Sequence, residues 1–139
     1  MRQPDVTIGE NYLERWYLIP RNRFLNVYLH KFSGSDDDRA LHDHPWHSVS
    51  FLLKGRLDEI MPARAGRLER QRRREVPRFI PVFRSATHAH RLELIEGPAW
   101  TVFITGPKFR SWGFLCPQGW RHWKDFTDAT GNNVGRGCE

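Results

Sequence analysis

Cysteine is scarce in this chain: only two of its 139 residues are cysteines, Cys116 and Cys138, and they form no CxxC pair. This composition predicts no disulfide framework and favours a reducing, cytoplasmic compartment. Long apolar runs are also missing, and none approaches the roughly 20 residues that a membrane-spanning helix needs. The segment Met1–Trp16 lacks the apolar core of a secretory signal. We therefore expect a cytoplasmic protein with no membrane partner.

Basic residues outnumber acidic ones, and the formal net charge is +6. Seven arginines lie between residues 64 and 78, where they could bind the phosphates of a nucleic acid. Glu69 and Glu75 interrupt this cluster, and no aromatic side chains alternate with the arginines as base-stacking platforms. The pattern instead favours a solvated hairpin arm or an edge strand protected by charge. A nucleic-acid partner is the weaker alternative.

Helical patterns are rare, whereas short runs rich in β-branched and aromatic residues recur between Gly, Pro and Asp turns. Strands are expected at residues 16–20, 24–32, 47–55, 78–84, 88–95, 99–106 and 111–117, with a Gly-Pro turn at 97–98 and a helix only at 8–15 or 120–128. Within 24–32, alternation places Tyr28, His30 and Phe32 on one face. The length and the pattern predict one all-β domain, an antiparallel sandwich or small barrel.

Two pairs of histidines carry the main functional signal. His42 and His44 stand two residues apart in a strand-like segment, so both imidazoles should project from the same face. His88 and His90 repeat this spacing, and their face continues into alternating leucines. Clustered imidazoles inside a protein need shared hydrogen bonds or a metal. The two pairs predict a metal site, with satisfied core or surface histidines as the alternative.

The segment around the first pair resembles the first motif of the cupins, small double-stranded β-helix barrels of the jelly-roll type. That motif is a glycine, five residues, HxH, three or four residues, a glutamate, six residues and a glycine. His42 and His44 match its HxH, and Gly55 matches its closing glycine. Ser48 occupies the glutamate position, and Asp36 occupies that of the leading glycine.

The second cupin motif is matched only at its histidine, by His90 or His88. The resemblance covers residues 21–128 and implies a single cupin-type jelly-roll domain over residues 1–139, with an irregular tail at 129–139. It also implies one divalent transition metal on His42, His44 and His90, with His88 as a candidate fourth ligand. Without a carboxylate, this set suits Fe(II), Zn, Ni or Cu better than Mg or Ca. Cupins that keep three histidines and lack the glutamate include thiol dioxygenases.

Five further side chains are predicted to shape the pocket. Trp46 and Ser48 follow the HxH closely, and Arg84 or Arg110 could bind a substrate carboxylate through a two-pronged contact. His30 shares a face with aromatic residues and is the candidate acid–base group, with a satisfied core histidine as the alternative.

Three neighbouring residues are expected to lie outside the site. His47 has the opposite strand parity to His42 and His44, which predicts an exposed neighbour. Asp58 and Glu59 are expected to be solvated turn residues beyond the ligand-bearing part of their strand.

Two functions remain open from the sequence. One is a mononuclear metal enzyme, dioxygenase-like, that acts on a small polar or anionic substrate. The other is a cupin that binds a small ligand without turning it over, as a sensor or storage module. Association with nucleic acid or a capsid through the arginine arm is a third and weaker hypothesis. Edge strands and an apolar tail favour a homodimer.

Overall fold

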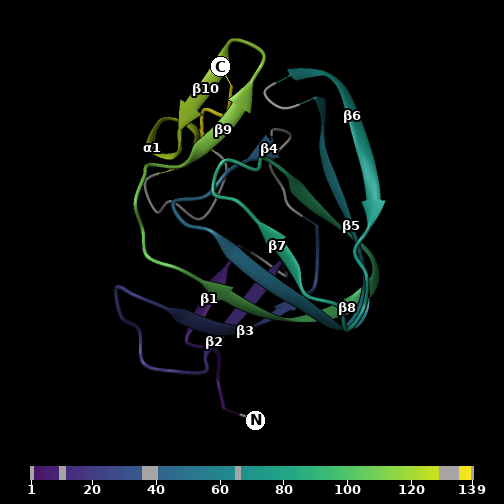
Figure 1. Cartoon of the computed structure of the whole chain (residues 1–139), viewed down its shortest axis with the longest axis vertical. Coiled ribbons are helices and arrows are strands. Elements are labelled where there is room, and N and C mark those ends of the chain that lie inside the picture. Colours follow the sequence, from purple (N-terminus) through teal and green to yellow (C-terminus); the bar gives the residue numbers. More distant parts are fainter. Residues whose placement is uncertain (1, 10–11, 36–40, 65–66, 129–134, 139) are drawn as a thin grey trace.

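The computed structural model describes residues 2–9, 12–35, 41–64, 67–128 and 135–138 of the chain. Asp36, which occupies the position of the leading cupin glycine, lies outside these residues. Within the described part, ten strands and one four-residue helix form two antiparallel sheets (Figure 1). An isolated bridge between His42 and His90 joins the two sheets.

The larger sheet has seven strands in the order β1-β2-β3-β8-β5-β6, with β7 paired to β5. Its strands are β1 (Val6–Ile8), β2 (Leu13–Tyr17), β3 (Asn26–Phe32), β5 (Ser48–Arg64), β6 (Arg67–Glu75), β7 (Val82–Arg84) and β8 (Arg91–Thr105). The smaller sheet has the order β10-β9-β4 and consists of β4 (Leu41–His42), β9 (Gly113–Cys116) and β10 (Gly119–His122), followed by helix α1 (Trp123–Phe126). This nearly all-β architecture confirms the predicted fold class.

Strand β3 follows the alternation predicted for it. Asn26, Tyr28, His30 and Phe32 are buried, and the residues between them are partly exposed. Because β3 pairs with β2 on one side and β8 on the other, its backbone hydrogen bonds are satisfied and its side chains can be divided cleanly between two faces. His30 and its aromatic neighbours therefore face the interior, as expected.

Strand β5 continues through Gly55, where its end was predicted. Its pairing with β8 shifts register between Leu52 and Leu57, and Gly55 has a positive φ of 83°. A Cβ at this position would lie 2.7 Å from the Cα of Ala99 and 2.8 Å from the carbonyl oxygen of Pro98. Only glycine meets both the backbone angle and the close approach, so this residue permits a β-bulge in the middle of the strand.

The bulge changes which residues of β5 face inward. Ser48, Ser50 and Leu52 are buried before it, and Leu57, Glu59 and Met61 are buried beyond it; Ile60 is also buried, in a separate cluster with Leu41 and Ala89. One extra residue in a strand exchanges its two faces, because side chains alternate with a period of two. The inward face therefore passes from even to odd positions at Gly55.

We expect the substitution Gly55→Ala to lower the free energy of unfolding by about 2–4 kcal/mol, from a left-handed backbone angle and from overlap with β8. Gly106→Ala is a matched control, because the nearest atom to its Cβ would be the carbonyl oxygen of His47 at 3.9 Å and its φ is not positive. Urea unfolding of the two variants measures the difference. Equal stability of Gly55→Ala and wild type would contradict the bulge.

A predicted turn and one of the two predicted helix ranges are wrong, and the other helix range is confirmed. Strand β8 runs through Gly97 and Pro98, where a turn was expected. The segment predicted as a helix at 8–15 instead contains the end of β1 and the first part of β2. Helix α1 lies inside the other predicted range, 120–128. Strands β1 and β2 extend the larger sheet ahead of residue 21, where the cupin resemblance begins.

Cys116 and Cys138 form a disulfide bond, contrary to the prediction. The bond ties residue 138 to the smaller sheet, where Cys116 is buried in one cluster with Phe114 and Phe126. Disulfide bonds persist mainly in oxidising compartments, so this bond weighs against the reducing compartment predicted above. No helix in the described part of the chain is long and apolar enough to cross a membrane.

Strand β6, which carries much of the arginine cluster, lies at one end of the larger sheet, as predicted for a charged edge. Arg73 donates to Asp58 at 3.0 Å and to Glu93 at 2.8 Å. Arg56 on β5 donates to Glu75 at 3.2 Å. These pairs balance part of the positive charge along the arm, which favours the solvated edge over a phosphate-binding surface.

Candidate metal centre

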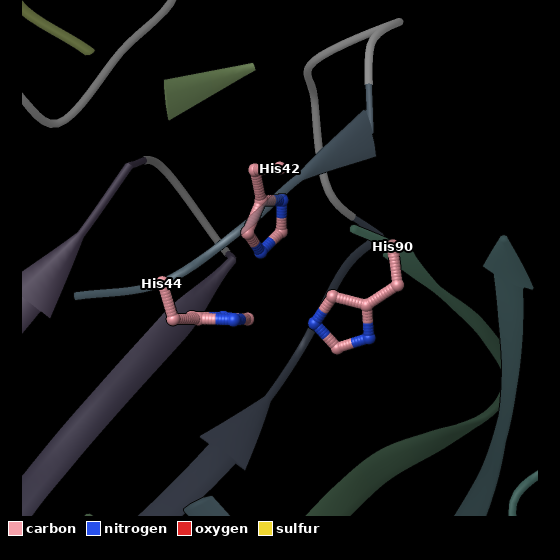
Figure 2. A group of neighbouring side chains, drawn as sticks. All are labelled: His42, His44 and His90. Carbon is pink, nitrogen blue, oxygen red and sulfur yellow. The ribbon is translucent and has the colours of Figure 1, made fainter. Parts of the chain in front are cut away.

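Three imidazoles meet where the two sheets join. His42 ends β4 and bridges His90, and each backbone N–H donates to the carbonyl of the other at 2.9 Å. His44 follows in the loop, where its backbone N–H donates to the carbonyl of Ala86 at 3.0 Å. The ring centroids of the three histidines lie 5.0–5.1 Å apart. The rings turn toward a common point (Figure 2), which brings together the three ligands predicted from the sequence.

This donor set fits a divalent transition metal. Each histidine offers one ring nitrogen, and the three nitrogens lie within 4.8 Å of one another. Burial lowers the pKa of His44 well below its usual value and the pKa of His90 to about 3, so both rings are neutral at pH 7. The buried Nδ1 of His44 has no hydrogen-bond partner in the described part of the chain. Neutral imidazoles that converge in this way are typical metal ligands.

Glu59 is a functional candidate that no sequence pattern indicated. It was expected to be a solvated turn residue, but its side chain is 0% exposed, so that prediction is wrong. Arg84 Nε lies 2.7 Å from its Oε2, and His88 Nε2 lies 3.0 Å from the same oxygen. Arg74 Nε donates to Oε1 at 2.8 Å. Glu59 is buried because the bulge at Gly55 turns its side chain to the inner face of β5.

Glu59 also determines which nitrogen of His90 is free to bind a metal. Burial alone would raise the pKa of Glu59, but hydrogen bonds with His88, His90 and Arg84 outweigh it and hold that pKa far below its usual range. An ionised carboxylate only accepts hydrogen bonds, so the Nδ1–H of His90 is the donor to Glu59. The Nε2 of His90 keeps its lone pair. Metal-binding histidines commonly donate their other N–H to a carboxylate in this way.

Asp43, between the paired histidines, holds their segment from the opposite side. Its carboxylate accepts hydrogen bonds from Gly113 N at 2.7 Å, Trp120 Nε1 at 3.0 Å and Arg110 at 3.1 Å. Arg110 also donates to the carbonyl of His44 at 2.8 Å. Arg110 does not line the cavity described below. The geometry therefore favours a supporting role for Arg110 over the predicted contact with a substrate carboxylate.

A cavity of about 460 Å³ includes the three histidines in its wall. Four of the predicted pocket residues also line it, namely Trp46, Ser48, Arg84 and His30. The indole of Trp46 stacks on the ring of His44, with centroids 4.9 Å apart. Ser48, at the cupin glutamate position, is 3% exposed. The described lining contains no carboxylate, so the cavity is suited to a ligand that carries negative charge.

His30 lies in the cavity wall, but its lone pair is already in use. Its Nε2 accepts a hydrogen bond from the Nε of Arg15 at 2.9 Å. Burial, and then the charge of Arg15, lowers the pKa of His30 well below its usual value. A neutral imidazole has only one acceptor nitrogen, so His30 is better placed to position Arg15 than to act as the predicted acid–base group.

His88 and His47 lie outside the group of three. His88 groups with Glu59 and His90 rather than with the converging nitrogens, so the structure favours a supporting role over that of a fourth ligand. His47 is exposed, and its Nδ1 accepts a hydrogen bond from the backbone N–H of Ala86 at 2.9 Å. This position confirms His47 as an exposed neighbour of the site.

Lowering the pH should destabilise the metal-free chain. Burial lowers the pKa of His30 well below its usual value and that of His90 to about 3. Below about pH 6.5 the unfolded chain therefore binds protons that the folded chain does not, which costs about 1.4 kcal/mol per pH unit for each such histidine. We expect Tm to fall steadily as the pH drops from neutral, and to fall less steeply in His30→Gln. A Tm that is flat or rises on acidification would contradict these neutral, buried rings.

No family model and no curated protein sequence matches the chain. Among solved structures, DMSP lyase DddQ from Ruegeria pomeroyi is 16% identical, with a TM-score of 0.54 over 78% of this chain and 54% of its own. A cupin superfamily protein from Desulfitobacterium hafniense is 8% identical, with a TM-score of 0.53 over 75% of this chain and 84% of its own. HppE, solved with Co(II) and substrate, is 17% identical, with a TM-score of 0.53 over 72% of this chain and 57% of its own.

These likenesses concern the fold, because all three identities are low. The chain spans only 54% of DddQ and 57% of HppE, so each of those proteins contains further structure that this chain does not match.

Proposed function

We propose that this chain, which has the cupin, double-stranded β-helix fold, is a mononuclear metal enzyme that acts on a small polar or anionic substrate. The observation that carries the proposal is the convergence of His42, His44 and His90 on one point of an interior cavity. HppE, a structure of similar fold, holds Co(II) and its substrate. That precedent supports a divalent ion as the group held here.

The chemistry of the ligands narrows the choice of metal. Three imidazole nitrogens suit Fe(II), Zn, Ni or Cu, whereas Mg and Ca prefer oxygen ligands. When bound by three side chains, such an ion keeps open positions and supplies Lewis-acid or redox chemistry. We propose dioxygenase-type chemistry, in which the ion is Fe(II).

The other side chains of the cavity would bind and shield the substrate. Trp46 and Phe103 contact each other at 5.3 Å between centroids and form an apolar wall beside His44. Ser48 is neutral at the position of the cupin glutamate, so a bound divalent ion would keep more of its positive charge. Arg84 also lies in the wall, but its charge is paired with the carboxylate of Glu59 at 2.7 Å, and it donates to Ser50 at 2.7 Å. The uncompensated charge of such an ion would favour an anionic substrate, and the aromatic wall would favour one with an apolar part.

Oxygen consumption by the Fe(II)-loaded chain tests this function. The experiment supplies a panel of small thiols and carboxylates, and it follows dissolved oxygen together with product mass. We expect consumption that depends on both Fe(II) and one substrate class, and that is lost in His44→Ala. Tight binding of a panel member without oxygen uptake or any new product would mean that the chain is a ligand-binding module and not an enzyme.

A further inference from the structure

Arg15 on β2 is a cation in the cavity wall that no sequence pattern singled out. It pairs in register with His30 on β3, and its Nε donates to the Nε2 of that histidine at 2.9 Å. Its guanidinium carbon lies 4.5 Å from the centroid of the Tyr28 ring. Within the described residues it forms no ion pair with a carboxylate. Burial lowers the pKa of its guanidinium. A largely desolvated guanidinium without a counter-ion is a site that an anion would stabilise.

The rest of the lining has the same sign of charge. Four cationic residues line the cavity, Arg15, Arg21, Arg84 and Lys108, and no carboxylate does so in the described part of the chain. Arg84 is neutralised by the buried carboxylate of Glu59 at 2.7 Å. Arg21 and Lys108 are exposed at the surface. Arg15 is therefore the interior cation whose charge is left for a ligand.

An aromatic wall connects Arg15 with the three histidines. The ring of His44 stacks on Trp46 at 4.9 Å, Trp46 contacts Phe103 at 5.3 Å, and Phe103 contacts His30 at 5.2 Å between centroids. His30 in turn holds Arg15. A ligand that lies along this wall meets apolar surface in its middle, a cation at one end and the histidine group at the other.

We infer that Arg15, held in place by His30, is the anion-binding subsite of this cavity, and that the substrate class is a small organic carboxylate with an apolar body. The terminal N–H groups of a guanidinium match the two oxygens of a carboxylate, and the planar fork gives direction as well as charge. The apolar body would lie against Trp46 and Phe103. This inference deepens the proposed function and rests on it only for the end of the ligand that faces the histidines.

Calorimetric titration of the chain with three probes tests the subsite, both as purified and after removal of metal. The probes are 3-phenylpropanoate, the neutral 3-phenylpropanamide, and acetate, which lacks an apolar body. We expect 3-phenylpropanoate to bind at least about tenfold more tightly than either of the others, since a charge-assisted contact and apolar burial both contribute. If the amide binds as tightly as 3-phenylpropanoate, or if 3-phenylpropanoate does not bind, the wild-type chain alone overturns the inference.

Two variants then locate the anion. Arg15→Gln should weaken 3-phenylpropanoate binding at least about tenfold, whereas Arg56→Gln, an exposed arginine paired with Glu75 outside the cavity, should not change it. Loss of binding in Arg84→Gln but not in Arg15→Gln would place the anion elsewhere and overturn the inference. The metal-free His42→Ala variant should still bind the probe. If the chain binds the probe but no metal, the proposed function is contradicted and the subsite stands. If it binds metal but not the probe, the subsite is contradicted and the proposed function stands.

Discussion

Replacing His90 with alanine should abolish stoichiometric binding of Co(II), and His42→Ala and His44→Ala should do the same. Each change removes one of three nitrogens that lie within 4.8 Å of one another, and two imidazoles cannot hold a divalent ion as three do. The loss of affinity should exceed the roughly 100-fold that a supporting residue outside the ligand set can cost. Optical titration with Co(II) measures it, because the visible bands of that ion report nitrogen coordination.

His47→Ala is the matched control for these three variants. His47 lies only three residues after His44 in the chain, but its ring accepts a hydrogen bond from the backbone of Ala86 and lies outside the converging group. Its Co(II) affinity should equal that of the wild type. Retention of tight Co(II) binding by His90→Ala, together with its loss in His47→Ala, would mean that the strand register around His42 is wrong.

Replacing Glu59 with glutamine should lower the free energy of unfolding by about 3–5 kcal/mol, the usual cost of leaving a buried charge without its partner. Arg84, 5% exposed, would lose its negative partner, and an NH2 group would replace one of the two oxygens that accept from Arg84 and Arg74. The same change should weaken Co(II) binding about 10–100-fold, because the Nδ1–H of His90 would no longer donate to a charged acceptor. Urea unfolding and Co(II) titration measure the two effects separately.

Glu93→Gln is the control for this variant. Glu93 accepts a hydrogen bond from Arg73 at 2.8 Å on the exposed side of the sheet, where an ion pair adds little stability. It should leave both stability and Co(II) affinity near those of the wild type. If Glu59→Gln is no less stable than Glu93→Gln, the buried network does not hold the core together. If its Co(II) affinity is also unchanged, Glu59 does not orient His90.

Strand alternation predicted that each histidine pair would present its two imidazoles on one face, but the choice of His90 ahead of His88 came from the cupin resemblance and not from alternation. His42 ends β4 and His44 lies two residues later in the loop, and His90 meets them from the position just before β8, through its bridge to His42. The inward face of β3 followed from the same rule, and it placed His30 correctly. Local periodicity works in these places because neither stretch contains an irregularity that changes its parity.

The remaining parts of the site depend on features that local periodicity does not carry. Glu59 faces inward only because the bulge at Gly55 exchanges the faces of β5. A glycine within a strand pattern does not by itself indicate a positive φ. Arg15 lies in a segment predicted as a helix, so its position beside His30 followed only from the pairing of β2 with β3. The disulfide joins Cys116 to a residue 22 positions later, and such a contact depends on the folded path of the chain.

The metal content of the chain, purified without chelator and without a nickel column, tests the central claim most directly. Elemental analysis should find one first-row transition metal ion per chain in the wild type, and none in a variant that lacks His42, His44 and His90. Absence of metal from the wild type, with no uptake when Fe(II), Zn, Ni, Cu or Co(II) is added at stoichiometric concentration, would contradict the assignment of these three histidines as a metal centre.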